Sequence, residues 1–134
     1  MGLHTALSVG ADSVLVVAWD MPFVNDSLVR MISERAQGAA FAVIPEGPGV
    51  SGGVAEKGGR LEPFCAVYTR ACLPIVEAAL DAGDLRLWRL IDRLPSIVRV
   101  PVEDVARAGE AARLFFNVNT AGDLAVAERM AREA

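Results

Sequence analysis

The sequence predicts a layered α/β domain with a mostly parallel sheet. Residues 14–19 form an unbroken apolar run, which is typical of a strand buried on both faces, as strands of parallel sheets are. Such runs alternate along the chain with segments that carry apolar residues at helical spacing. At 134 residues, 53% apolar and 22% charged, the chain is long enough for one globular domain, residues 1–134.

Ten elements are expected, in the order helix, strand, helix, strand, strand, helix, helix, strand, strand, helix. Asn25 should cap the second helix, and Gly83 should end the third, at 71–82. Thr120, with Asp123 three residues later, should open the last helix as a capping box. Residues 45–59, rich in glycine and proline, predict a surface loop without the Gly-Lys-Ser/Thr of a P-loop. The expected ranges are 3–9, 13–18, 26–37, 41–44, 64–68, 71–82, 84–94, 96–102, 114–118 and from Thr120 onward.

Asp20 is the residue that most suggests chemistry. It follows the apolar run directly, and Pro22 two residues later ends the strand because proline cannot donate to a sheet. A carboxylate at that point lies at the carboxyl edge of the sheet, where open α/β folds bind ligands. A ligand or metal role is therefore expected, and the alternative is that Asp20 only caps the next turn.

Composition and charge exclude several classes of protein. The net charge of −4 argues against a nucleic-acid surface, and no apolar stretch approaches membrane-spanning length. No secretory signal is visible, so a cytoplasmic location is expected. The spacing of Cys65 and Cys72 matches no common zinc pattern, which favours buried free thiols.

Three segments, in the same order, resemble the molybdenum cofactor guanylyltransferases of the MobA type. Val16–Phe23 is similar to the family's strand followed by Asp-Met-Pro. Gly59–Tyr68 resembles its central strand with a proline, and Phe115–Thr120 resembles its Asn-Val-Asn-Thr signature. The family's opening strand and glycine-rich loop have no counterpart here. The resemblance thus covers nearly all of this chain but only the C-terminal two-thirds of the family, as in an N-terminally truncated nucleotidyltransferase-like domain.

The resemblance implies a three-layer Rossmann-like nucleotide-diphospho-sugar transferase fold. It also implies transfer of GMP from GTP to molybdopterin, with release of pyrophosphate. Asp20 would then be the catalytic residue and the ligand of Mg2+, a cation that one or two carboxylates and phosphate oxygens usually hold. Gly2, Arg86, Asn117 and Asn119 would bind the pterin substrate.

The residues themselves leave some of these roles open. Arg86 can pair with a phosphate through two hydrogen bonds, or it is an ordinary solvated arginine. Asn117 and Asn119, two apart, present two amides on one face, or they only organise the turn before Thr120. Trp19 stands where the family often has cysteine, and it either lies beneath the nucleotide or packs in the core.

Two other interpretations of the whole chain are kept. Without the glycine-rich loop, the chain could be a non-catalytic remnant that binds pterin cofactor or a partner such as a molybdoenzyme or cofactor-synthesis protein. Its uncovered strands would then favour a homo-oligomer. Alternatively, Met1 is an internal methionine of a longer protein. Related cytidylyltransferases and sugar-phosphate nucleotidyltransferases also stay open.

Overall fold

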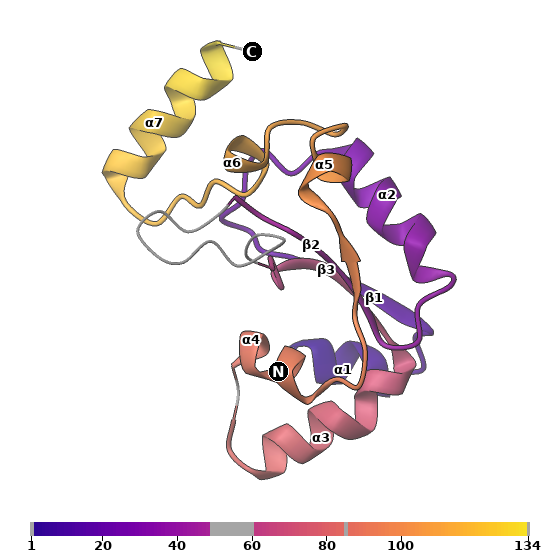
Figure 1. Ribbon diagram of the computed structural model, residues 1–134. Helices are drawn as coiled ribbons and strands as arrows, with labels where there is room; N and C mark the ends of the chain where they lie inside the picture. The colour runs from indigo at the N-terminus through magenta and orange to yellow at the C-terminus, as the bar shows by residue number, and fades with distance from the viewer. Residues whose placement is uncertain (1, 49–60, 85, 134) are drawn as a thin grey trace.

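The computed structural model describes residues 2–48, 61–84 and 86–133 and shows a four-stranded sheet between two groups of helices (Figure 1). β3 is antiparallel to both β1 and β2, whereas β4 is parallel to β2. The strands, in the spatial order β1-β3-β2-β4, are β1 (Ser13–Val17), β3 (Cys65–Thr69), β2 (Ala42–Pro45) and β4 (Val98–Val100).

The layered α/β class with a mixed sheet is confirmed, but antiparallel pairs outnumber the parallel pair among the described strands. Parallel pairing needs a crossover connection, usually a helix, and the sequence predicts no helix between β2 and β3. These two strands therefore pair antiparallel. Most of the predicted loop at 45–59 falls outside the described residues.

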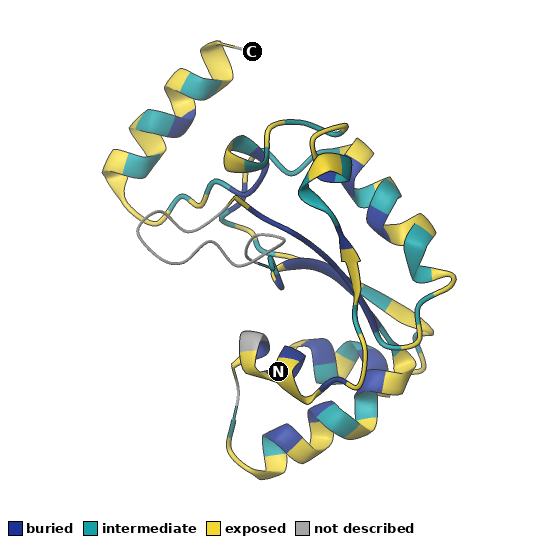
Figure 2. Ribbon diagram, in the orientation of Figure 1, coloured by how far each residue is buried: buried dark blue, intermediate teal, exposed yellow. Residues whose placement is uncertain are grey.

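Alternate residues of the central strands point to opposite faces and divide the core in two. Figure 2 shows buried residues along the central strands and on helices of both layers. Ala42 and Ile44 face the cluster formed with the helices α1 (Gly2–Ser8), α3 (Leu73–Asp81) and α4 (Leu87–Arg93). Val43 faces the cluster formed with α2 (Asp26–Ala36), α5 (Val102–Val105) and α6 (Ala111–Leu114). A 3-10 turn, Arg70–Cys72, precedes α3. No helix in the described residues is long and apolar enough to cross a bilayer.

β1 differs from the prediction, because it lies at an edge of the sheet and is not buried on both faces. Val14 and Val16 pack against the core, whereas Leu15 and Val17 are exposed. β1 has only one neighbouring strand among those described, and an apolar run in the sequence does not reveal how many neighbours a strand has. β2, between two strands, is buried along its whole length.

The C-terminal part also differs from the prediction. Residues 114–118 form no strand: α6 ends at Leu114, and residues 116–119 have no regular structure. The four-residue helices α5 and α6 were not predicted, because elements this short carry little periodicity. The predicted capping box is confirmed, and it opens α7 (Ala121–Arg132), which extends away from the rest of the molecule in Figure 1.

Candidate functional site

Asp20 lies in a tight turn directly after β1. The backbone N–H of Ala18 donates to the carbonyl of Phe64 (2.8 Å), which continues the pairing of this edge strand. The N–H of Met21 returns to the carbonyl of Ala18 (3.3 Å), so Trp19 and Asp20 occupy the two central positions of a four-residue turn. Met21 is buried and anchors the turn, while Asp20 is half-buried.

The turn lies at the predicted edge of the sheet. β1 and β2 are both antiparallel to β3, and β4 is parallel to β2, so these three strands end at the same edge. The expected position of Asp20 at the carboxyl end of β1 is therefore confirmed. Trp19, beside it, is 97% exposed, so among the described residues it does not pack in the core.

The segment that carries Asn117 and Asn119 reaches this turn from the far end of the sequence. The backbone N–H of Val118 donates a 2.8 Å hydrogen bond to the backbone carbonyl of Asp20. Val118 is half-buried, and the asparagine on each side of it is exposed. The structure thus brings together the two segments that carry the carboxylate and the pair of amides, which the sequence singled out separately.

The turn before α7 is organised by other groups than the two asparagine side chains. Asp123 Oδ2 accepts from the backbone N–H of Asn119 (3.1 Å) and of Thr120 (3.2 Å), and Thr120 Oγ1 accepts from the N–H of Asp123 (3.0 Å). In the described part of the chain, neither the Asn117 nor the Asn119 side chain has a hydrogen bond. Both amides are accordingly available at the surface beside Asp20.

Arg113 holds this region together from α6. Its guanidinium carbon lies 4.6 Å from the centroid of the Phe23 ring, in a cation–π contact. Its Nη1 also donates to the backbone carbonyl of Met130 in α7 (3.0 Å). Arg113 therefore connects the loop after Asp20 with the helix after Asn119. The sequence analysis did not select it, since a lone arginine on a short helix carries no pattern.

Gly2 and Arg86 belong to a different layer of the molecule. Gly2 begins α1 and is exposed, and Arg86 precedes α4. Both helices cover the face of the sheet opposite α2 and α6. The predicted site residues thus form two sets. Asp20, Asn117 and Asn119 lie at the edge of the sheet, whereas Gly2 and Arg86 belong to the layer of α1 and α4.

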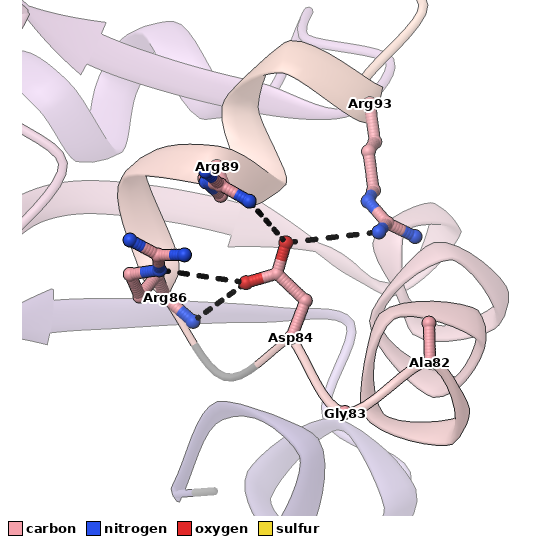
Figure 3. A pocket seen from close by; sticks show the side chains of 6 residues that line it. All are labelled: Ala82, Gly83, Asp84, Arg86, Arg89 and Arg93. Carbon is pink, nitrogen blue, oxygen red and sulfur yellow. Dashed lines mark hydrogen bonds and ion pairs between the residues drawn. The ribbon is translucent and has the colours of Figure 1, made fainter.

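Arg86 is one of three arginines around a single carboxylate (Figure 3). Asp84, whose side chain is only 15% exposed, lies within 4 Å of Arg86, Arg89 and Arg93. Arg89 and Arg93 were missed by the sequence analysis. The spacing of 86, 89 and 93 places all three on one face of α4, and this was the signal that could have found them.

Glu46 is a second carboxylate at the carboxyl edge of the sheet, and the sequence analysis also missed it. It follows the buried β2 just as Asp20 follows β1. It is 4% exposed, forms an ion pair with Arg99 (3.2 Å) and accepts from the backbone N–H of Val102 (3.2 Å). Glu46 therefore links the end of β2 to the end of β4, and its role is structural.

The two thiols are structural, as predicted. Cys65 and Cys72 are free and buried. Burial, with a smaller contribution from the negative charge of Glu62, raises the pKa of Cys65 to about 12, and burial raises the pKa of Cys72 to about 11. Thiols with such pKa values are protonated at neutral pH, so neither is suited to nucleophilic chemistry.

Asp20 is a carboxylate of the kind that Mg2+ takes as a ligand. Among the described residues there is no group of three or more His, Cys, Asp or Glu side chains that could enclose a metal ion. Mg2+ needs only one or two carboxylates when phosphate oxygens and water complete its shell. The half-buried Asp20, with two exposed amides next to it, meets that requirement.

A family model described as a MobA-like NTP transferase domain matches residues 1–98, nearly three-quarters of the chain. This chain belongs to the MobA-like NTP transferase family. The family assignment agrees with the resemblance drawn from the three motifs. The first two motifs lie inside the matched residues, and the Asn-Val-Asn-Thr segment lies beyond them.

Relatives with assigned names extend the similarity over the whole chain. The probable molybdenum cofactor guanylyltransferase of Pelotomaculum thermopropionicum is 34% identical, over 99% of this chain and 60% of that protein. The molybdenum cofactor guanylyltransferase of Desulfosudis oleivorans is 31% identical, over 96% of this chain and 58% of that protein. The chain thus spans about three-fifths of the length of these family members.

Solved structures support the same fold. Molybdopterin-guanine dinucleotide biosynthesis protein A of Archaeoglobus fulgidus superposes with a TM-score of 0.79 at 28% identity, over 99% of this chain and 62% of that one. The 2-C-methyl-D-erythritol 4-phosphate cytidylyltransferase of Thermus thermophilus gives a TM-score of 0.65 at 25% identity, over 94% and 65%. The Rossmann-like nucleotidyltransferase fold expected from the sequence is confirmed.

Proposed function

We propose that this chain carries part of the active site of a nucleotidyltransferase that moves GMP from GTP to molybdopterin. The observation that carries the proposal is the hydrogen bond between Val118 and Asp20, because it joins two family motifs that are about a hundred residues apart in sequence. The names of the relatives from Pelotomaculum and Desulfosudis support the choice of substrates. An oligomer, a molybdoenzyme partner and a cytoplasmic location stay predictions from the sequence.

The reaction forms one phosphorus–oxygen bond and breaks another. To give a dinucleotide, a phosphate oxygen of the acceptor must attack the α-phosphorus of GTP, while the bond to the β-phosphate breaks and pyrophosphate leaves. Such a transfer needs positioning and charge neutralisation more than covalent chemistry. The protein must therefore hold two phosphate-bearing substrates close together.

Asp20 is assigned the metal-binding role in this proposal. Mg2+, when bound, would neutralise phosphate charge during the transfer. The turn fixed by Met21 and Val118 holds the backbone of Asp20 just after β1, where it cannot shift without breaking a hydrogen bond. Rigid placement of this kind is what positioning catalysis requires.

The acceptor side is assigned to the other predicted residues. Asn117 and Asn119 each present an amide that can both donate and accept, which suits the polar edge of a pterin. Arg86, and Gly2 with no side chain to exclude a ligand, would contact the same substrate from the α1–α4 layer. These roles are inferred from family resemblance and from the exposure of the residues.

The test is an assay of dinucleotide formation with GTP, Mg2+ and molybdopterin, using Asp20→Asn. The variant keeps the size of the side chain but removes the charge, so we expect a loss of at least about a hundredfold in transfer. Asp92→Asn, an exposed carboxylate on α4, is the matched control and should keep wild-type activity. Wild-type activity in Asp20→Asn would refute the role given to this residue.

A binding remnant is the second candidate, because the chain spans about three-fifths of its relatives. It predicts that the chain forms no dinucleotide but still binds molybdopterin, and that Asn117→Ala with Asn119→Ala weakens this binding. Equilibrium binding of molybdopterin, measured beside the transfer assay, separates the two candidates. Transfer by the 134-residue chain would exclude the remnant.

A further inference from the structure

Exposed apolar side chains gather on and around the edge strand β1. Two lie in the strand, one precedes it and one follows it in the turn before Asp20. A fifth belongs to the residue whose carbonyl accepts from the N–H of Ala18, at the end of β1 (2.8 Å). Exposed apolar patches mark interaction surfaces. The residues of this β1 patch are Val9, Leu15, Val17, Trp19 and Phe64.

The two side chains within β1 face the same side of the sheet as α2. Leu15 is paired with Val67 and Val17 with Cys65, and directly paired residues point to the same face. Val67 and Cys65 belong to the core cluster formed with α2, α5 and α6, whereas the two β1 residues are exposed. The helical layer on this face therefore ends before it covers β1.

The outer edge of β1 presents main-chain groups from alternate residues. Because the N–H of Ala18 donates to Phe64 of the neighbouring segment, the even-numbered residues of β1 direct their N–H and C=O groups toward β3. Ser13, Leu15 and Val17 direct theirs to the opposite side, where no strand of the described residues pairs. Such an edge is a template for a further strand.

The two edges of the described sheet differ in their protection against pairing. β4 has three residues, carries Arg99 and is followed by Pro101. A short strand, a charge and a proline are common devices that block pairing at an edge. β1 has five residues, none of them charged and none of them proline. Its edge is therefore the one that can accept another strand.

We propose that β1 pairs antiparallel with β1 of a second copy of this chain, about a two-fold axis perpendicular to the sheet at Leu15. In this register Leu15 lies opposite the partner's Leu15, and Ser13 lies opposite the partner's Val17. Every outward N–H then meets an outward C=O. The axis keeps the α2 faces of both copies on one side, so the two β1 patches join. The inference does not depend on the proposed transfer reaction.

The ends of β1 favour a second copy as the occupant of this edge. Val9 and Trp19 are the most exposed side chains of the β1 patch, and they lie at opposite ends of the strand. Antiparallel pairing brings the Trp19 end of one copy to the Val9 end of the other, where each can cover the other. At about 150–250 Å² for an aromatic side chain, the two copies of Trp19 supply about a quarter of the ~1,200–2,000 Å² in a stable interface. The paired strands and the other side chains of the patch supply further area.

The test is analytical ultracentrifugation of the 134-residue protein, whose chain mass is 14.2 kDa, over a range of concentrations. We expect a monomer–dimer equilibrium whose dissociation constant rises at least about tenfold in Leu15→Lys/Val17→Lys, because lysines at position 15 would face each other across the two strands. Val98→Lys/Leu124→Lys is the matched control. It adds the same charges at two other exposed apolar positions, one of them on β4, and should stay within about twofold of wild type.

Three results would overturn the proposal. One is a folded wild-type protein that stays monomeric at every concentration, and another is a dimer that both lysine double variants weaken equally. The third is a series of assemblies larger than a dimer, because these indicate a head-to-tail contact and not a closed two-fold pairing. Circular dichroism checks that each protein in the comparison is folded.

Cysteine cross-linking tests the register with milder substitutions. Directly opposite residues of antiparallel strands have Cα atoms about 5.5 Å apart or less, which is within reach of a disulfide. Leu15→Cys should therefore form a disulfide-linked dimer on oxidation, whereas Ser13→Cys should cross-link only when it is mixed with Val17→Cys. The wild type is the control for Cys65 and Cys72, which are buried. Cross-linking of Ser13→Cys alone, without any of Leu15→Cys, would refute the pairing about Leu15.

Discussion

The backbone amide of Val118 donates a 2.8 Å hydrogen bond to the backbone carbonyl of Asp20, and this bond joins the two ends of the candidate site. Asp20 lies in the turn after β1, and Val118 lies between two exposed asparagines just before α7. Because the bond runs between main-chain atoms, any residue except proline at position 118 can make it. The relative position of carboxylate and amides is thus set by the backbone.

Val118→Pro should separate these two segments. Proline has no N–H, so the carbonyl of Asp20 loses its partner, and we expect a loss of about 1 kcal/mol or more in the free energy of unfolding. Val118→Thr has nearly the same shape and keeps the N–H, so it should stay much closer to wild type. Urea denaturation of the three proteins measures the difference. Equal stability of the proline and threonine variants would show that the bond contributes nothing.

Gly83→Ala should strain the turn that presents Asp84. At a φ of +76° a Cβ costs about 1–2 kcal/mol, although no atom lies within 4 Å of the place it would occupy. Gly38→Ala is the control, because Gly38 is also in open space but does not have a positive φ. We expect a lower urea midpoint only for Gly83→Ala. A midpoint equal to that of Gly38→Ala would contradict the left-handed conformation.

Glu46 should contribute to stability through its acceptor atoms. Glu46→Ala leaves the N–H of Val102 without its side-chain acceptor and removes the ion pair with Arg99, so we expect a loss of about 1–3 kcal/mol. Glu46→Gln keeps an oxygen for Val102 and should lose less. Glu103→Ala, at an exposed position nearby, should change stability little. The urea midpoints should therefore fall in the order Glu103→Ala, Glu46→Gln, Glu46→Ala, and any other order would count against this role.

The thiols should make stability fall in alkaline solution. Folding raises the pKa of Cys65 from 9.0 to about 12 and that of Cys72 to about 11, so the folded thiols stay protonated where unfolded ones ionise. The unfolded state therefore binds fewer protons above pH 9, and the free energy of unfolding falls by up to about 1.4 kcal/mol per pH unit for each thiol. Below pH 9 the contribution is fully present.

Urea denaturation between pH 9 and 10 measures this slope. Tyr68, with an ordinary pKa of 10.0, is also present in a variant without the thiols, so its ionisation in the unfolded state does not account for a difference between that variant and the wild type. Cys65→Ala/Cys72→Ala is the control and should show a flatter dependence over that interval. A slope that is the same in wild type and in the double variant would mean that the thiols ionise alike in both states.

Local signals in the sequence were sufficient for many of the elements. Asn25 caps α2 through its side-chain oxygen, and Thr120 with Asp123 forms the predicted capping box, since both devices depend on residues a few positions apart. The strand that ends before Asp20 was predicted from its apolar run. The strand expected at 114–118 was wrong. Leu114 and Phe115 are buried at the end of a short helix, residues 116–118 form an irregular segment, and five residues cannot distinguish this from a strand.

The candidate site was predicted in pieces. Asp20 and the two asparagines could be selected one by one, because each stands at a recognisable motif. Arg89 and Arg93 could have been selected from their spacing with Arg86, which places them on one face of α4. Glu46 could not, since a glutamate after a strand is common, and only a neighbour distant in sequence shows its structural role. Arg99, the partner of Glu46, comes from a strand more than fifty residues later.

The sequence by itself determined the layered α/β class, the caps of α2 and α7 and the position of Asp20 at the end of a strand. These follow from the order of apolar runs and from contacts within one turn of chain. Tertiary structure alone decided that β1 is an edge strand and that Val118 meets Asp20. Such features depend on which distant segments become neighbours when the strands pair and the two core clusters form. The order of residues along the chain does not specify those neighbours.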